Sequence, residues 1–250
     1  MSRNGNSPES ISVFFPAYND APSLPGLIER TFAVLLQHFP QHEVIVVNDG
    51  SFDNTAVVLE QLQQHYPALR VVTHPENRGY GAALRTGFAS ARNDLVFYTD
   101  GDGQYDPSEL IRLFERLTPA TGFVNGYKLE RNDPWHRIWI GKTYNQFARL
   151  LFGVRIRDID CDFRLIRRAL LQNIELTSTS GTICVELVRK LELSGWKVEE
   201  IGVHHYPRRH GRSQFFRLRS LFTTFYQLIR LRLQLWSGGA KGFLQRCLYL

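Results

Sequence analysis

Short apolar runs alternate with helix-like segments through the first half of the chain, and this alternation constrains the fold more than any other feature. Buried strands are predicted first, at residues 11–15, 44–47, 69–73 and 95–98, and later at 122–127 and 196–205. Helices are predicted at residues 22–38, 53–66, 82–91, 135–152 and 181–193. Strands and helices that alternate through short connections form a parallel sheet covered on both faces. The sequence therefore predicts an α/β domain with a mostly parallel sheet.

Polar turns that hold aspartate follow three of the first four predicted strands. They contain Asp20, then Asp49, and then Asp100 with Asp102. Each turn alone has a simpler explanation, because aspartate also caps helices and closes surface turns. Parallel strands, however, place their carboxyl ends at one edge of the sheet, where the ligands of open α/β sheets bind. Three such turns at one edge predict a nucleotide-type pocket with a metal ion.

The segment DLVFYTDGDGQYDP, residues 94–107, carries the chemistry of this pocket. Asp100 and Asp102 flank Gly101, which allows the backbone to turn sharply between them. Two carboxylates suit a hard divalent cation that is shared with phosphate oxygens, and Gln104 adds a neutral oxygen. Asp106 and Pro107 then predict a helix start. A lone DGD is usually a surface turn, so its meaning depends on the motifs around it.

The charge of the chain is divided unevenly along its length. Residues 1–130 hold 9 basic and 15 acidic residues, whereas residues 131–250 hold 21 basic and 9 acidic ones. A basic second half predicts an anionic partner: nucleic acid, phosphate groups or an anionic membrane. Three widely spaced cysteines fit a reducing compartment. Neither a signal peptide nor a membrane span is expected from the apolar runs.

Four motifs in the first half, in this order and spacing, resemble the family 2 inverting glycosyltransferases. They are PAYND at 16–20, NDGSFDNT at 48–55, NRGYGAALRTGF at 77–88 and YTDGDGQYDP at 98–107. More closely, these motifs resemble the branch that includes dolichyl-phosphate mannose synthase and bacterial polyprenyl-phosphate glycosyltransferases. A helix that begins near Trp135 fits this branch as well, and so do three later segments. They are GYKLERND at 126–133, RDIDCDFRLIRR at 157–168 and HYPRRHGRSQ at 205–214. The resemblance covers roughly residues 10–215 and implies the GT-A fold, one nucleotide-binding α/β domain with the acceptor region appended.

The resemblance also implies roles for single residues. Donor binding would fall to Pro16, Ala17, Tyr18, Asp20, Asp49, Gly101 and Arg208. Asp100 and Asp102 would hold Mg²⁺ or Mn²⁺ against the donor diphosphate, with Gln104 close to the metal. Arg208 would begin a loop that closes over the donor, in which Gln214 replaces the usual lysine. Asp20 replaces a common glutamate and Asn48 a common aspartate, so the nucleotide base stays open.

The acceptor half of the chain decides the reaction. A hydroxyl acceptor needs a carboxylate to take its proton, and Asp158, Asp160 and Asp162 are available. A lipid monophosphate is already an anion near neutral pH, so arginines that bind it suffice. The many arginines favour the phosphate. By resemblance, Arg137 and Arg149 bind the acceptor phosphate and count as catalytic beside Asp100 and Asp102, with Arg164 as a third phosphate ligand.

Two further segments complete the expectations. Glu186, on the predicted helix 181–193, is expected to be a solvated helix residue. Residues 215–236 are apolar and carry four arginines, and their longest uncharged run, 220–229, is too short to span a bilayer. They predict a helix that lies in the membrane interface, or one that packs on the sheet or on another subunit. The expected organisation is a disordered N-terminus at 1–10, a GT-A domain at 11–212 and a C-terminal amphipathic segment at 213–250.

These observations predict a metal-dependent enzyme that moves a hexose from a nucleotide-sugar to a dolichyl- or undecaprenyl-type polyprenyl phosphate. It would act peripherally at the cytoplasmic face of a membrane, with a membrane subunit or homo-oligomer as a further expectation and no nucleic-acid partner. The alternatives are a family 2 glycosyltransferase that acts on a sugar hydroxyl and an inactive membrane-associated scaffold. A nucleotidyltransferase would carry a glycine-rich, lysine-containing loop after the first strand, where PAYND stands. A nucleic-acid-binding protein does not fit the acidic pocket.

Overall fold

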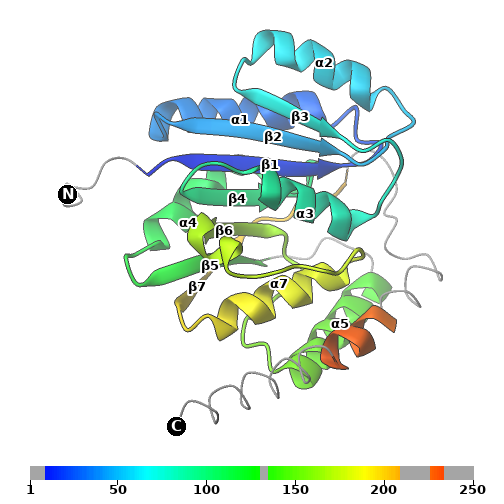
Figure 1. Cartoon of the computed structure of the whole chain (residues 1–250), viewed down its shortest axis with the longest axis vertical. Coiled ribbons are helices and arrows are strands. Elements are labelled where there is room, and N and C mark those ends of the chain that lie inside the picture. The colour runs from blue at the N-terminus through cyan, green and yellow to red at the C-terminus, as the bar shows by residue number, and fades with distance from the viewer. Residues whose placement is uncertain (1–8, 130–134, 209–225, 234–250) are drawn as a thin grey trace.

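The computed structural model describes residues 9–129, 135–208 and 226–233 (Figure 1). Its strands are β1 (Ile11–Ala17), β2 (His42–Asn48), β3 (Leu69–Thr73), β4 (Leu95–Thr99), β5 (Thr121–Lys128), β6 (Phe163–Arg167) and β7 (Lys197–Val203). Its α-helices are α1 (Leu24–His38), α2 (Thr55–His65), α3 (Tyr80–Ser90), α4 (Leu110–Arg116), α5 (Trp135–Phe152), α6 (Arg168–Gln172) and α7 (Thr182–Leu193). A short 3₁₀ helix, η1 (Pro107–Glu109), precedes α4, and residues 226–233 are also helical.

The seven strands form one sheet in the order β3-β2-β1-β4-β6-β5-β7. β1, β2, β3 and β4 pair in parallel, and so do β5 and β7. β6 runs antiparallel to both of its neighbours, β4 and β5. The predicted mostly parallel sheet is therefore confirmed, with one reversed strand that the sequence patterns do not predict.

Two hydrophobic cores lie on the two faces of the sheet, because neighbouring residues of a strand point to opposite faces. Val13 and Phe15 of β1 enter the core beneath α1, α2 and α4, whereas Phe14 enters the core beneath α3, α5 and α7. All three side chains are fully buried. Burial of each such side chain stabilises the fold by roughly 1.5–3 kcal/mol, so both helical layers are held by the strands between them.

The predicted elements of the first half are confirmed, with ends that shift by a few residues. The first helix begins at Leu24, after Pro22, and the third begins at Tyr80, earlier than expected. The predicted start at Asp106 and Pro107 is confirmed as well. The Asp106 carboxylate accepts a hydrogen bond of 3.0 Å from the Ser108 amide, and Pro107 opens η1.

The two chain ends are described in part. Residues 1–8 of the expected disordered N-terminus lie outside the described residues, whereas Glu9 pairs with Arg167 at 2.8 Å. The boundary expected at 212–213 also lies outside them and stays a prediction. In the helical segment 226–233, Leu228 and Leu231 are buried with the α5 and α7 core. No helix within the described ranges is long and apolar enough to cross a membrane.

Candidate active site

The DGD turn lies directly after β4, against the end of β1. The Gly101 amide donates to the Pro16 carbonyl at 3.2 Å. A Cβ atom at Gly101 would lie 2.7 Å from that carbonyl oxygen, so a side chain there would push the two turns apart. Gly103 has a φ of +74°, which favours glycine. The two glycines therefore let Asp100 and Asp102 lie at the carboxyl edge of the sheet.

Asp100 lies in a buried and strongly negative environment. Its burial, together with the charges of Asp162 and Asp102, raises the pKa of the Asp100 carboxyl well above its ordinary value. The Tyr80 hydroxyl donates a hydrogen bond of 2.8 Å to Asp100 Oδ1 and opposes this rise. The turn thus concentrates negative charge in a place that water reaches poorly, and such charge attracts a cation.

Asp102 is 5% exposed and is bonded through both of its oxygens. Its Oδ1 accepts the Gln104 amide at 3.0 Å, and its Oδ2 pairs with the Arg208 guanidinium. Arg208 therefore supplies positive charge at the carboxylate that the sequence assigns to a divalent ion. Carboxylate oxygens are the ligands that Mg²⁺ and Mn²⁺ prefer. The residues of the turn fit the predicted cation.

The protein supplies part of such a metal shell. Within the described ranges, no group of three or more His, Cys, Asp or Glu side chains is arranged to hold a metal ion. Mg²⁺ is usually held by one or two carboxylates together with waters and substrate phosphates. The pair of Asp100 and Asp102 matches that pattern better than it matches a site built wholly from protein ligands.

Gln104 joins the DGD turn to the segment that follows β7. Its side-chain Nε2 donates to the Tyr206 carbonyl at 3.0 Å, and its own carbonyl accepts the Tyr206 amide at 2.8 Å. This clamp holds residues 204–208, and with them Arg208, beside the two aspartates. The amide nitrogen thus acts in positioning, while the predicted metal contact through the amide oxygen stays a prediction.

The PAYND turn contributes two kinds of residue to the site. The side chains of Pro16 and Ala17 are buried, so these two residues reach the site through their backbones. The Ala17 carbonyl accepts the Asp49 amide at 2.9 Å, which joins the ends of β1 and β2. The Tyr18 ring is half-buried and meets the Phe52 ring edge-on, with centroids 6.0 Å apart. Phe52 is 83% exposed, so an aromatic surface faces solvent at this edge of the sheet.

Asp20 bonds its own turn instead of capping α1. Its carboxylate accepts the Tyr18 amide at 3.0 Å, and Ser23 occupies the N-cap position of α1. Burial raises the pKa of Asp20 to about 6, against the lowering effect of that hydrogen bond. Capping of α1 therefore does not explain this residue, and its place beside Tyr18 is compatible with the predicted donor contact.

Asp49 forms several hydrogen bonds within the protein, and its predicted contact with base or ribose stays a prediction. It is 3% exposed, and its Oδ1 accepts from His74 at 2.6 Å and from the Arg78 amide at 2.9 Å. Its Oδ2 accepts from the Gly79 amide at 2.9 Å. Both oxygens are thus used inside the protein. Asp49 orders the loop that leads into α3 and brings Tyr80 to Asp100.

Tyr80 and His74 are two site-supporting residues that the sequence analysis does not single out. Tyr80 is the first residue of α3 and follows Gly79, whose φ of +91° favours glycine. The place of Tyr80 inside the NRGYG motif is the sequence signal that could have singled it out. His74 bridges Asp49 and the Thr86 hydroxyl, at 2.6 and 2.9 Å. Its position directly after a strand gives no comparable signal.

The two arginines predicted for the acceptor phosphate both lie on α5. Arg149 is exposed, and its guanidinium donates to the Arg155 carbonyl at 3.4 Å. Arg137 is in the same helix, and its side chain is outside the described part of the structure. At 1.5 Å rise per residue, twelve residues place the two backbones about 18 Å apart. A shared phosphate would have to lie between them, with both side chains extended toward it.

Arg164 is fully buried, and this placement corrects its prediction as a direct ligand of the acceptor phosphate. Its Nε donates to the Asn125 side chain at 2.6 Å, and its guanidinium also pairs with Asp162 at 2.9 Å. The remaining donors contact the Tyr98 hydroxyl and the Ile159 carbonyl. A buried guanidinium needs such partners because an unpaired charge in the interior is costly. Arg164 thus supports Asp162, whose charge acts on Asp100.

The carboxylates available as bases for a hydroxyl acceptor are engaged within the protein. Asp158 is 4% exposed and accepts from the Lys128 amide and from Asn145, both at 3.4 Å. Asp160 accepts from Asn145 at 2.9 Å, and Asp162 pairs with Arg164. Asp162 thus pairs with an arginine of the same segment, whereas Asp158 and Asp160 are held by Asn145 and, for Asp158, a backbone amide.

Glu186 is fully buried, so its expected role as a solvated helix residue is wrong. It accepts hydrogen bonds from the Ser178 amide at 2.8 Å, the Thr177 amide at 3.0 Å and Lys190 at 2.6 Å. Burial alone would raise its pKa, but these bonds outweigh burial and lower the pKa of the carboxyl. Glu186 thus fixes the segment 177–180.

The segment 177–180 connects α3 to the helical residues 226–233. The Gly81 amide donates to the Thr179 carbonyl at 2.9 Å, and a Cβ atom at Gly81 would lie 2.5 Å from the Ser178 carbonyl oxygen. On the other side, the Ser180 hydroxyl donates to Gln227 at 2.7 Å. The start of α3 and the C-terminal segment are therefore held to one loop.

Curated proteins with similar sequences include transferases that act on undecaprenyl phosphate. The undecaprenyl-phosphate 4-deoxy-4-formamido-L-arabinose transferase of Pseudomonas aeruginosa is 33% identical over 213 residues, which are 84% of this chain and 62% of that protein. The protein of the same name from Aeromonas hydrophila is 30% identical over 228 residues, which are 90% of this chain and 68% of that protein. The chain thus spans less than two thirds of the Pseudomonas relative.

Solved structures share the fold at lower identity. A mannosyltransferase from Pyrobaculum calidifontis, in complex with GDP-Man and Mn²⁺, matches with a TM-score of 0.64 and 20% identity over 90% of this chain and 65% of that one. Glucosyl-3-phosphoglycerate synthase from Mycobacterium tuberculosis, with Mn²⁺, UDP and phosphoglyceric acid, matches with a TM-score of 0.67 and 19% identity over 90% and 78%. These likenesses confirm the predicted GT-A fold.

A family model described as "Glycosyl transferase family 2" matches residues 12–175. The matched range includes the PAYND turn, the DGD turn and Asp162, which the fold brings to one edge of the sheet. The family predicted from the motifs is confirmed: the chain belongs to glycosyl transferase family 2.

Proposed function

We propose that the protein transfers a glycosyl group from a nucleotide-sugar to a polyprenyl phosphate, with Mg²⁺ or Mn²⁺ bound at Asp100 and Asp102. The observation that carries this proposal is the pair of carboxylates at the end of β4, with Arg208 against Asp102. The names of the curated relatives include undecaprenyl phosphate, which supports a lipid phosphate as the acceptor. The Mn²⁺ complexes of the solved structures support the metal. The sugar in the relatives' names is a modified arabinose, so transfer of a hexose by this chain stays a prediction.

The donor end of the site is assigned to the turns that follow β1, β2 and β4. A divalent ion, when bound by the two aspartates, offsets the negative charge that develops on the leaving diphosphate. Arg208 would then exchange Asp102 for a diphosphate oxygen, because both are anions that a guanidinium binds well. Tyr18 and Phe52 offer ring surfaces to the base, and Asp20 lies beside Tyr18 at the same edge.

The acceptor end requires no general base in this proposal. A phosphate oxygen of the lipid attacks the anomeric carbon, a new C–O bond forms, and the bond to the diphosphate breaks with its electron pair on the leaving oxygen. The acceptor is already an anion near neutral pH. Arg149 and Arg137, both on α5, would orient the attacking phosphate. The internal bonds of Asp158 and Asp160 agree with a reaction in which they take no proton.

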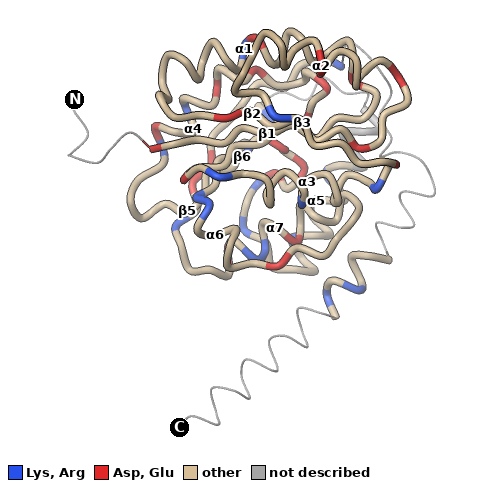
Figure 2. Tube along the Cα trace, turned by 45° about the horizontal axis from the view of Figure 1, so that its top comes forward, with Lys and Arg blue, Asp and Glu red and all other residues tan. Residues whose placement is uncertain are grey.

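A membrane-facing surface is proposed on α5 and residues 226–233. Large apolar side chains are exposed there: Phe147, Leu150, Tyr226, Ile229 and Leu233. Arg149, Arg230 and Arg232 are exposed beside them, and Figure 2 shows basic positions on the short helix. Apolar residues flanked by arginines suit the interface of an anionic membrane. We therefore propose that the protein binds peripherally to the cytoplasmic face of a membrane through this surface. The alternative is that a membrane subunit or a second copy of the chain covers the surface.

A transfer assay tests the proposal directly. The full chain is incubated with Mg²⁺ or Mn²⁺ and a panel of radiolabelled nucleotide-sugars, with and without polyprenyl phosphate, and label in the organic phase is counted. Transfer that needs both lipid and metal is the expected result. Metal-dependent donor hydrolysis without lipid labelling would move the acceptor to a hydroxyl. No signal from any donor, with a folded protein, would favour the inactive scaffold.

A further inference from the structure

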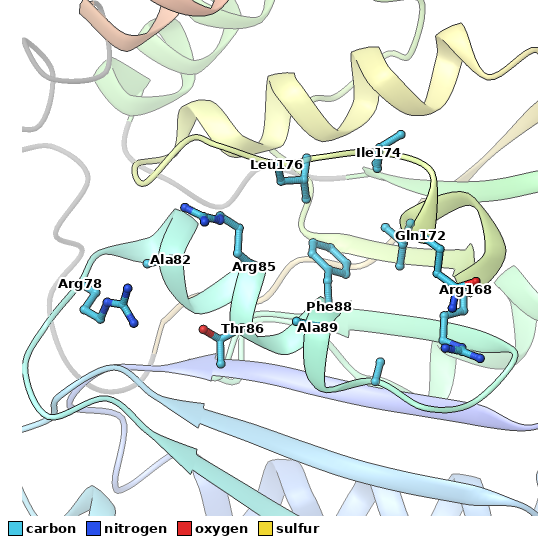
Figure 3. Close-up of a pocket in the computed structure, with 12 residues that line it drawn as sticks. Arg78, Ala82, Arg85, Thr86, Phe88, Ala89, Arg168, Gln172, Ile174 and Leu176 are labelled. Atoms are coloured by element: carbon cyan, nitrogen blue, oxygen red, sulfur yellow. The ribbon is translucent and has the colours of Figure 1, made fainter.

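A groove of about 470 Å³ runs along α3, on the side that faces α6 and residues 172–176 (Figure 3). Its lining residues come from α3, from α6, and from the connections before α3, after α3 and after α6. None of these lining residues belongs to the DGD turn, to PAYND or to residues 204–208. The groove is therefore a feature separate from the proposed catalytic site.

The floor of the groove is apolar. Phe88 forms its middle and is 8% exposed, and Leu171, Ile174 and Leu176 form the opposite wall. Three small residues, Ala82 and Ala89 of α3 and Ala91 after it, also line the groove. Leu171, Ile174 and Leu176 are half-buried, so an apolar group that covers them removes apolar surface from water and gains free energy.

Three arginines line this apolar floor. Figure 3 shows Arg78 and Arg85 toward one end and Arg168 at the other. None of the three guanidiniums forms an ion pair within the part of the chain that the structure describes, and the lining contains no acid. The Nε of Arg168 is buried and has no hydrogen-bond partner there. A buried donor without an acceptor is rare in native proteins and indicates a missing partner.

We propose that this groove binds a phosphate ester that carries an apolar group. The phosphate would pair with the arginines at one end of the groove, because a guanidinium binds phosphate oxygens through two parallel hydrogen bonds. A phosphate monoester carries a charge of about −1.5 to −2 near neutral pH, which suits several unpaired cations. The apolar group would cover Phe88, Leu171 and Leu176. Neither feature depends on the reaction proposed above.

The test measures binding of two probes to the full chain by isothermal titration calorimetry. The probes are dihexanoyl phosphatidic acid below its micelle concentration and inorganic phosphate. The lipid is expected to bind at least about tenfold more tightly than phosphate, since it alone covers the apolar floor. Equal affinities would overturn the apolar part of the proposal and leave a site for free phosphate. Absence of binding by either probe would overturn the proposal.

Matched variants locate the binding. The double variant Arg85→Glu/Arg168→Glu is expected to weaken lipid binding at least about tenfold, as reversed charges repel the phosphate. Arg30→Glu makes a similar change at an exposed position of α1 and is expected to bind like the wild type. Ala89→Trp adds bulk to the groove without a change of charge and should also block the lipid. If the double variant binds normally and Arg149→Glu does not, the phosphate lies at the proposed acceptor site and the inference is refuted.

Discussion

Replacement of Glu186 by glutamine changes one buried oxygen into an NH₂ group. The carboxylate accepts the Thr177 and Ser178 amides and pairs with Lys190. In the variant, the NH₂ group faces a backbone N–H and two donors oppose each other. The Thr177 amide lies within hydrogen-bond distance of both oxygens and keeps an acceptor. Either the Ser178 amide or the Lys190 ammonium therefore loses its acceptor, and Lys190 in both cases loses the charge that it pairs with. The fold is expected to survive with a looser segment at 177–180.

The size of the effect follows from these contacts. Loss of a hydrogen bond to a charged acceptor costs about 1.5–3 kcal/mol when the partner stays buried. We expect Glu186→Gln to lower the free energy of unfolding by about 2–3 kcal/mol. For a chain of this size, each kcal/mol shifts the melting temperature by about 2–4 °C, so a fall of about 4–12 °C is expected.

The pH dependence of this difference gives a second readout. The folded-state pKa of Glu186 lies below its ordinary value of 4.5, so its stabilising effect is present above that pH and is lost as the pH falls through the folded-state pKa. The gap in melting temperature between wild type and variant should be full at neutral pH and should narrow in acid. Glu175→Gln, at an exposed position of the same connection, is the control. Equal melting temperatures of wild type and Glu186→Gln at neutral pH would refute the reasoning.

Three further predictions concern the edge of the sheet. Asp102→Asn should lower the transfer rate by about 10²–10³-fold and leave the melting temperature nearly unchanged. The control Asp106→Asn keeps a capping side chain and should retain transfer. Normal turnover of Asp102→Asn would exclude the metal assignment. Gly101→Ala should abolish transfer in a folded protein, because its methyl group would meet the Pro16 carbonyl; circular dichroism and the transfer assay check this together. Asp20→Asn should be more stable than the wild type above about pH 6. The raised pKa of Asp20 makes the stability of the wild type fall as the pH rises from about 4 to 6. Melting curves above about pH 6 that show no gain for the variant would contradict this prediction.

The parts of the fold that depend on local patterns could be predicted from the sequence. The strands 69–73 and 95–98 stand out because each is a short run of apolar or β-branched residues between turn signals. The DGD turn could be placed at a strand end for the same reason. Asp100 and Asp102 lie at the carboxyl edge of the sheet because parallel strands end together. This placement follows from the topology of the sheet and does not depend on contacts between distant residues.

The parts that depend on distant partners could not be predicted. β6 contains Arg164 between Phe163 and Leu165, and the burial of Arg164 depends on Asn125 and Tyr98, which lie 39 and 66 residues away. Glu186 has the spacing of a surface helix residue, and its burial depends on the backbone of a neighbouring segment. Asp49 follows a strand as a ligand-binding residue would, and its bonds to His74 and to the Arg78 amide depend on partners 25 and 29 residues away. A single sequence does not show which polar groups find partners inside the fold.

The reversed direction of β6 has a consequence for how proteins with this sheet diverge. β5 ends at Lys128 and β6 begins at Phe163, and both points lie at the edge that carries the DGD turn, since Phe163 pairs with Thr99 at the end of β4. The chain between them, which includes α5, thus leaves the sheet and returns to it at the same edge. The closure entropy of such an excursion grows slowly with its length. Insertions or deletions between β5 and β6 can therefore change the surface beside the DGD turn while the strand order stays unchanged.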